Sequence, residues 1–153
     1  VSVESFDAAA CAGRIKNIPY MIGFTKDDMG RSPDAVDNFC ALRNDAGTPV
    51  FAYQFAHELP DDEAGSHDMK GAFHSSELWF MFKSLEHSDR PFTDADWELA
   101  EHIVSCWTDF AKTGNPGNGW NAYTREKPEF MVFNLDEENK LDSSAMGRPI
   151  VNK

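Results

Sequence analysis

The 153-residue chain lacks an excess of basic residues, a long apolar run and a C-x-x-C pair of cysteines. Lysine and arginine number 14, against 26 aspartates and glutamates, so the formal charge is −12. A protein of that sign is repelled by nucleic-acid phosphates and by anionic lipid surfaces. No apolar run approaches the roughly 18–20 residues that a membrane-spanning helix needs. The sequence therefore predicts no nucleic-acid partner and no membrane-spanning helix.

The three cysteines, Cys11, Cys40 and Cys106, are odd in number and widely spaced. This arrangement argues against a disulfide framework and against a zinc site. Free thiols are typical of a reducing compartment and favour the cytoplasm. The chain opens on Val1, and no basic stretch followed by an apolar one can be read as a targeting signal. We expect the natural start to be processed or to lie elsewhere.

The residues that are present have the composition of a globular protein. Hydrophobic residues make up 41% and charged residues 26%, and 12 phenylalanines with 4 tryptophans supply large side chains for a core. No internal repeat, low-complexity tract or flexible linker divides the chain. We expect one domain, or part of a larger one, over residues 1–135. A polar tail with little fixed structure is expected over residues 136–153.

Short apolar runs between turn signals predict strands. The runs at residues 18–24 and 49–55 are rich in aromatic and β-branched residues, and a third candidate is the run at 130–133. A short helix is predicted within residues 31–46, between the first two strands.

The clearest predicted element is a helix that begins after Phe92. Thr93 is a good N-cap and Asp96 occupies the capping-box position, while Gly114 before Asn115 and Pro116 supplies the C-terminal stop. Apolar residues recur at steps of three and four along this segment, at Trp97, Ala100, Val104, Trp107 and Ala111. We expect one broad side of the helix to be buried.

The acidic stretch at residues 58–63 is interpreted as a solvated loop. It lacks the spacing of an EF-hand calcium loop. A metal-binding domain remains an alternative, and its ligands would be His57, Asp61, His67 and Asp68.

One histidine stands out among the five, which are His57, His67, His74, His87 and His102. A histidine taken at random is more often surface or core filler than a catalyst, and four of these are interpreted in that way. His74 lies after a flexible loop and directly before an apolar run at residues 78–82. An imidazole at that position can project from a rigid edge into a cleft.

Four motifs carry a resemblance to a known family. They are GFTKDD at residues 23–28, VFAYQF at 50–55, GAFHSSEL at 71–78 and WTDFAKTGNP at 107–116. In this order they resemble the C-terminal portion of type B carboxylesterases, the cholinesterase-like α/β-hydrolases. The resemblance extends from about residue 18 to about residue 133. It implies an α/β fold class: the C-terminal portion of an α/β-hydrolase sheet with flanking helices, incomplete without the upstream sequence.

The resemblance also implies roles for individual residues. His74 matches the general base and acid of a Ser–His–acid triad, and Asp28 matches the acid, which holds the ring tautomer and stabilises the imidazolium. The family usually has Glu and then Gly at this position, whereas Asp28 is preceded by Asp27 and followed by Met29. Asp27 therefore stays open as the alternative acid. Glu77 matches an acidic position that supports the active-site network.

Aromatic residues follow the histidine at Trp79, Phe80 and Phe82. These side chains are candidates to line an apolar acyl pocket. Apolar residues directly after a loop usually begin a packed element, so we favour core positions for them.

The chain contains no G-x-S-x-G nucleophile elbow. In the α/β-hydrolase fold the triad comes in the order serine, acid, histidine. The resemblance thus implies that the serine and the oxyanion hole belong to the N-terminal part of the same enzyme, and that this fragment alone is inactive. The complete enzyme would hydrolyse a small-molecule carboxylic ester through a serine acyl-enzyme, with no metal and no organic cofactor. A non-catalytic cholinesterase-like interaction module is the alternative.

Overall fold

The computed structural model describes residues 5–29, 33–135 and 146–150. The elements in chain order are α1 (Phe6–Cys11), β1 (Tyr20–Thr25), α2 (Pro33–Asp45), β2 (Val50–Phe55), α3 (Leu78–Met81), the 3-10 helix η1 (Leu85–His87), α4 (Asp94–Thr113), β3 (Phe130–Phe133) and β4 (Met146–Gly147). The strands predicted at 18–24, 49–55 and 130–133 are confirmed, as is the helix within 31–46. None of the described helices combines the length and the apolar character that crossing a membrane demands.

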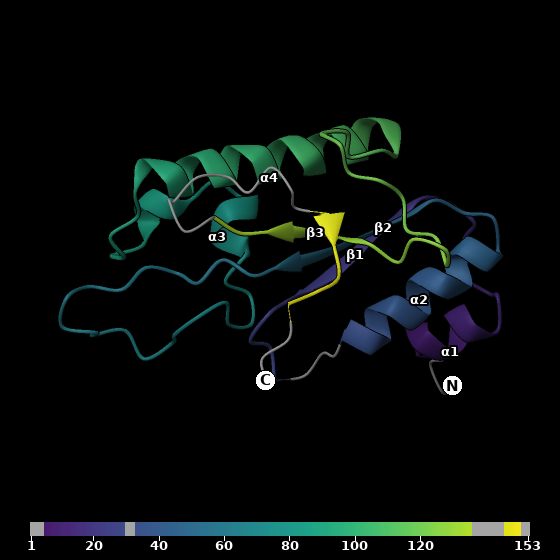
Figure 1. Cartoon of the computed structure of the whole chain (residues 1–153), viewed down its shortest axis with the longest axis horizontal. Helices are drawn as coiled ribbons and strands as arrows, with labels where there is room; N and C mark the ends of the chain where they lie inside the picture. Colours follow the sequence, from purple (N-terminus) through teal and green to yellow (C-terminus); the bar gives the residue numbers. More distant parts are fainter. Residues whose placement is uncertain (1–4, 30–32, 136–145, 151–153) are drawn as a thin grey trace.

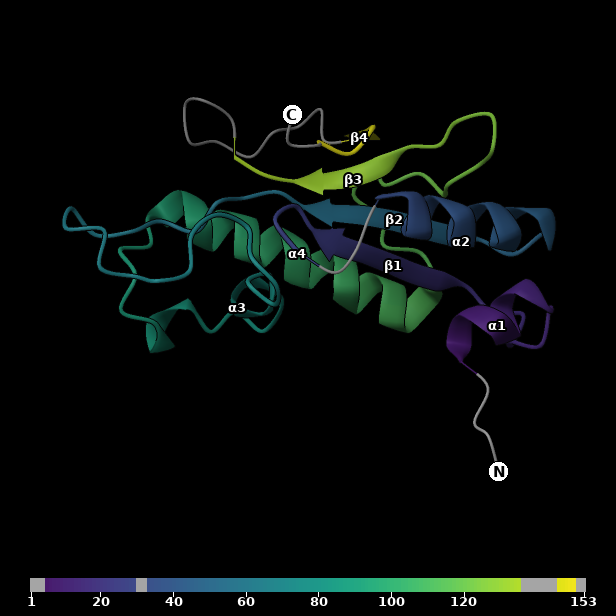
Figure 2. The ribbon, with the colours of Figure 1, turned by 90° about the horizontal axis from the view of Figure 1, so that it is seen from below.

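The strands form one sheet in the order β1-β2-β3-β4 (Figure 2). β1 pairs with β2 in parallel, β2 pairs with β3 in parallel, and β4 is antiparallel to β3. Because parallel strands end at the same edge of a sheet, the segments that follow β1 and β2 emerge side by side. Ligands of open α/β sheets bind at this carboxyl edge.

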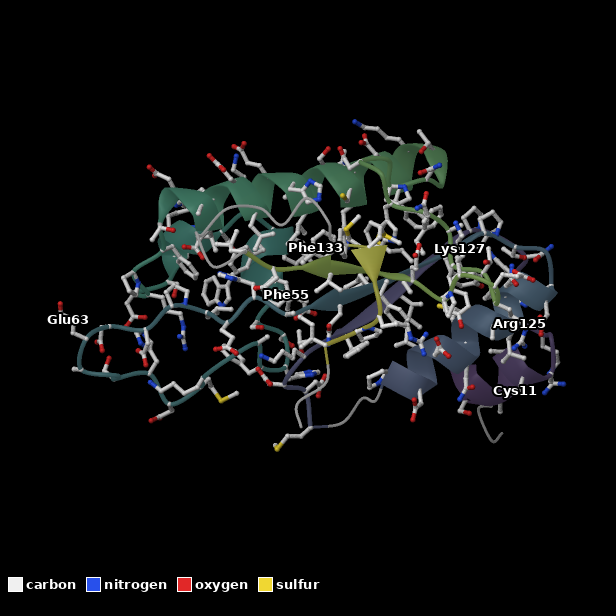
Figure 3. The ribbon with its side chains drawn as sticks, in the orientation of Figure 1. Cys11, Phe55, Glu63, Arg125, Lys127 and Phe133 are labelled. Carbon is white, nitrogen blue, oxygen red and sulfur yellow. The ribbon has the colours of Figure 1, made fainter. Side chains whose placement is uncertain are left out.

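Helices cover both faces of the sheet. α4 lies on one face, and α1 and α2 lie on the other (Figure 1). Successive side chains of a strand point to opposite faces, so Phe51 and Phe55 pack in the core cluster of α4, whereas Val50 and Ala52 pack in that of α2. Figure 3 shows Phe55 in the interior of the molecule. A strand buried on both faces explains the nearly continuous apolar sequence of β2.

The predicted helix after Phe92 is α4, and both of its predicted ends are confirmed. The Asp96 Oδ2 accepts hydrogen bonds of 2.7 Å from the backbone N–H and from the Oγ1 of Thr93. At the other end Gly114 adopts the left-handed conformation, with φ of 75°, and its N–H donates to the Phe110 carbonyl. This conformation carries little steric cost for glycine, and it ends the helix.

The described part of the tail differs from the expectation of little fixed structure. Residues 146–147 add a strand to the sheet. Next to it, the buried side-chain amide of Gln54 exchanges two hydrogen bonds with the backbone of Ile150, of 2.7 Å and 2.8 Å. Residues 136–145 and 151–153 lie outside the described residues, so the expectation stays a prediction for them.

Candidate active site

The chain turns sharply where β1 ends, and this turn positions two carboxylates. The N–H of Lys26 still donates to the Phe55 carbonyl of β2 at 2.8 Å, which continues the strand pairing by one residue. Two residues later, the N–H of Asp28 donates back to the Thr25 carbonyl at 3.2 Å. Asp27 and Asp28 therefore stand at the carboxyl edge of the sheet.

The long loop that follows β2 returns to the same edge before α3. Figure 1 shows it extending away from the sheet and back, and Figure 3 places Glu63 at its tip. On its return the N–H of Leu59 donates to the Gly71 carbonyl at 3.3 Å, and the N–H of Asp27 donates to the Ala72 carbonyl at 3.0 Å. These contacts bring residues 71–74 beside the end of β1.

His74 and Asp28 meet at this point. The imidazole Nδ1 lies 2.9 Å from the Asp28 Oδ2, although the two residues are 46 positions apart. The His74 side chain is 72% exposed, whereas that of Asp28 is 11% exposed. A carboxylate at Nδ1 favours the tautomer with the proton on Nδ1, which puts the ring lone pair on Nε2. The distance falls within the hydrogen-bond range that a histidine–acid pair requires.

Asp27 has a different contact. Its Oδ2 accepts a 2.8 Å hydrogen bond from the backbone N–H of Ala72, two residues before His74. The other candidate acid, Asp28, contacts the imidazole itself.

Glu77 is half-buried next to this pair. Burial raises the pKa of its carboxyl group above the usual range, against the lowering effects of its own backbone N–H and of His74. Within the described residues, its Oε2 is buried without a hydrogen-bond partner, and so are the Ser76 Oγ and the Thr25 Oγ1. Buried polar atoms usually have partners, so these three atoms are exceptions in the described part of the chain.

The aromatic residues after His74 divide between core and surface. Phe80 has no exposed surface, and its ring contacts those of Phe55, His57 and Phe92. Phe80 therefore lies in the core, the position favoured for it from the sequence. Trp79 is half-buried against the same cluster.

Two apolar side chains of the segment that follows His74 are exposed. Leu78 is 41% exposed and Phe82 is 74% exposed. They lie four residues apart, at the start and just beyond the end of the single turn of α3, which places them on one side of it. Sequence reasoning named Phe82 and missed Leu78.

The four residues of the predicted metal-binding alternative do not assemble within the described structure. Asp61 contacts His67 with one oxygen and the Lys70 ammonium with the other, and the second ring nitrogen of His67 lies 3.1 Å from Asp89. His57 lies apart from this group and pairs with Asp96. The ligand atoms that do gather within 4.8 Å come from Asp61, Asp62 and His67.

A buried histidine–aspartate pair was missed by sequence reasoning. The His57 Nε2 lies 2.6 Å from the Asp96 Oδ1, and both side chains are nearly enclosed. His57 follows β2, and Asp96 is the capping-box residue of α4. The capping pattern located Asp96, but no sequence signal pointed to its partner.

The sequence model of the carboxylesterase family matches residues 33–147. The chain belongs to the carboxylesterase family. It is 34% identical over 102 residues to the para-nitrobenzyl esterase of Bacillus subtilis (strain 168), an alignment that covers 62% of this chain and 19% of that esterase. With human bile salt-activated lipase it shares 26% identity over 114 residues, which cover 70% of this chain and 14% of the lipase.

Solved esterase structures share the fold. A PNB esterase superposes with a TM-score of 0.68 at 22% identity, over 92% of this chain and 38% of the esterase. A thermophilic PNB esterase gives a TM-score of 0.67 at 21% identity, over the same shares. The predicted α/β fold, part of an α/β-hydrolase sheet with flanking helices, is confirmed. The chain spans well under half the length of the relatives it matches.

Proposed function

We propose that this chain carries the acid and the general base of a serine carboxylesterase, with Asp28 as the acid and His74 as the base. The observation that carries the proposal is the 2.9 Å contact between Asp28 and the exposed imidazole at the carboxyl edge of the sheet. Membership of the carboxylesterase family supports ester hydrolysis as the reaction class.

The chemistry follows from the ring tautomer. The His74 Nε2 takes the proton of the serine hydroxyl as the serine oxygen attacks the ester carbonyl carbon. The resulting imidazolium gives this proton to the leaving alcohol, and the acyl-enzyme remains. The imidazole next takes a proton from the water that attacks the acyl group, and then returns it to the serine. Asp28 holds the Nδ1–H and stabilises the imidazolium in both half-reactions. These steps require no metal and no organic cofactor.

The nucleophile is proposed to come from the N-terminal part of the same enzyme. The 153 residues contain no G-x-S-x-G elbow. The aligned segment covers 19% of the para-nitrobenzyl esterase, which leaves most of such a protein to supply the serine and the oxyanion hole. Without those groups the chain alone is inactive.

Small carboxylic esters are the proposed substrates. Leu78 and Phe82 present apolar surface in the segment that follows His74, and such surface suits an apolar acyl or alcohol group. The alternative function, a non-catalytic interaction module, gives no reason to pair an exposed imidazole with a carboxylate.

The proposal is tested with p-nitrophenyl acetate as substrate, in the complete enzyme and in the 153-residue chain alone. His74→Gln in the complete enzyme is expected to lower kcat by about 10³–10⁴-fold or more, because the serine loses its base. His87→Gln is the matched control, since His87 is exposed and contacts Glu86 in η1. Full activity of His74→Gln would overturn the catalytic role. If the 153-residue chain alone hydrolyses the ester, and His74→Gln abolishes this activity, then the serine does not come from another part of the enzyme.

A further inference from the structure

We propose that Asp27 is a positioning residue that anchors the loop carrying His74, while its neighbour Asp28 contacts the imidazole. The placement of His74 by this anchor rests on the contacts around Asp27. Only its effect on catalysis rests on the proposed function.

Asp27 holds Ala72 through two hydrogen bonds. Its backbone N–H donates to the Ala72 carbonyl at 3.0 Å, and its side-chain Oδ2 accepts from the Ala72 N–H at 2.8 Å. Ala72 has no exposed surface. Since water does not reach this amide, loss of the carboxylate would leave a buried N–H unsatisfied. A hydrogen bond to an ionised carboxylate is also stronger than one between neutral groups.

Gly71 lets the carboxylate come this close. Gly71 has a φ of +72°, and a Cβ at this position would stand 2.4 Å from the Asp27 Oδ2. Any other residue would therefore collide with the anchor and would also adopt a strained backbone conformation. On the other side, the N–H of Leu59 donates to the Gly71 carbonyl.

The two aspartates close a small ring of contacts. One side of this closed set of contacts is the backbone from Asp27 to Asp28, and the other is the backbone segment from Ala72 to His74. Hydrogen bonds join the two sides at both ends, from Asp27 to Ala72 and from Asp28 to His74. Because the His74 side chain is 72% exposed, packing alone does not fix its position. The anchor at Ala72 supplies that constraint through the backbone.

Substitutions at Asp27 test the anchor in the full 153-residue chain, labelled with 15N. Asp27→Ala is expected to speed hydrogen exchange of the Ala72 amide by at least about tenfold. It is also expected to lower the share of His74 with its proton on Nδ1, read from the ring 15N shifts, although Asp28 is unchanged. Asp27→Asn keeps an oxygen acceptor and should restore most of both signals.

Two further variants make the result decisive. Asp45→Ala removes a carboxylate that pairs with Arg125 on the exposed side of α2, and it should leave both signals unchanged. Gly71→Ala displaces the carboxylate without altering Asp27, so it should shift the His74 tautomer as Asp27→Ala does. This variant decides the question if Asp27→Ala does not fold. The anchor would be overturned if neither Asp27→Ala nor Gly71→Ala changed the hydrogen exchange of the Ala72 amide and the His74 tautomer. It would also be overturned if Asp27→Asn were as impaired as Asp27→Ala.

Activity of the complete enzyme separates this inference from the proposed function. Asp27→Ala should lower kcat by about 10–100-fold with little change in KM, since a misplaced base affects the chemical step. If His74→Gln abolishes activity while Asp27→Ala leaves kcat unchanged, positioning fails and the esterase assignment stands. If Asp27→Ala shifts the His74 tautomer while His74→Gln keeps full activity, the anchor stands and the esterase assignment fails.

Discussion

Two of the histidine–aspartate pairs, His57–Asp96 and His74–Asp28, use the same kinds of side chain in opposite settings. In both pairs a segment that follows a strand at the carboxyl edge supplies one partner, Asp28 after β1 and His57 after β2. The His57–Asp96 contact of 2.6 Å joins side chains that are 11% and 4% exposed. The His74–Asp28 contact of 2.9 Å leaves the imidazole 72% exposed.

The buried pair has a structural role. The His57 ring packs against Phe55 and Phe80, and Asp96 also caps α4, so the buried pair fastens the end of β2 to the start of the helix. In the His74–Asp28 pair only the imidazole is exposed, and water competes for that group and weakens the contact. The proposed function depends on the exposure of the His74 ring, since a serine and an ester must reach it.

The largest expected effect on stability comes from breaking the buried pair. Asp96→Ala should lower the free energy of unfolding by about 3–5 kcal/mol, because it leaves His57 buried without its partner and removes the cap of α4. Asp28→Ala should lower it by less, because the partner that it leaves behind, His74, is exposed and can be solvated. Urea denaturation of both variants measures the contrast. Equal losses would erase the distinction between the pairs.

The pH dependence of stability sharpens the same contrast. Burial alone would raise the pKa of Asp96, but hydrogen bonds from His57 and Thr93 outweigh it and hold the pKa below its usual range. A depressed carboxyl pKa adds stability that is complete above the unfolded pKa of about 4 and is lost as the pH falls through the folded value. The difference in unfolding free energy between the native chain and Asp96→Asn should therefore shrink below about pH 4. A difference that stays constant from pH 7 to pH 2.5 would contradict this account.

A smaller effect is expected at Arg90, which supports the loop before His74. Its Nη1 donates to the Pro60 carbonyl at 2.9 Å, its Nη2 donates to the Met69 carbonyl at 2.7 Å, and the guanidinium lies over the Phe73 ring. Arg90→Ala should lower the free energy of unfolding by about 1–3 kcal/mol and speed proteolysis of the loop.

Arg90→Lys is the matched variant for this loop. A lysine keeps the charge but lacks the two-pronged donor geometry, so it should recover only part of the stability. Full recovery by Arg90→Lys would show that charge, and not the paired hydrogen bonds, holds the loop.

The smallest expected effect is at Glu77. Burial raises the pKa of its carboxyl group, so the charged form costs stability once the pH rises through the folded pKa. Glu77→Gln removes this cost and should raise the free energy of unfolding at pH 7 by about 1 kcal/mol or less, with a smaller gain at pH 3. A lower stability of Glu77→Gln at pH 7 would mean that the carboxylate has a stabilising partner.

Local signals made much of the fold predictable. β2 is a short run of strong strand formers, and α4 has a capping box, a regular apolar period and a terminal glycine within its own sequence. The short helices were missed, because α1 and α3 have six and four residues, too few to show a period. The attachment of Ile150 to Gln54 joins residues 96 positions apart and has no local signal.

The candidate site was predictable only where a motif marked it. Asp28 and His74 lie in motifs that resemble the carboxylesterases, and those motifs implied a pair 46 positions apart. His57 and Asp96 are 39 positions apart, and no motif linked them. The exposure of Leu78 depends on which side of a single turn faces the core, a property that the sequence of four residues does not fix.

The most direct test of the central claim, that Asp28 steers the His74 imidazole for acyl transfer, is kcat of Asp28→Asn in the complete enzyme. An amide at this position favours the wrong ring tautomer and does not stabilise the imidazolium. We predict a loss of about 10³–10⁴-fold in kcat with a melting temperature close to that of the unmodified enzyme. A loss of less than about tenfold would show that His74 does not depend on Asp28 and would contradict the account.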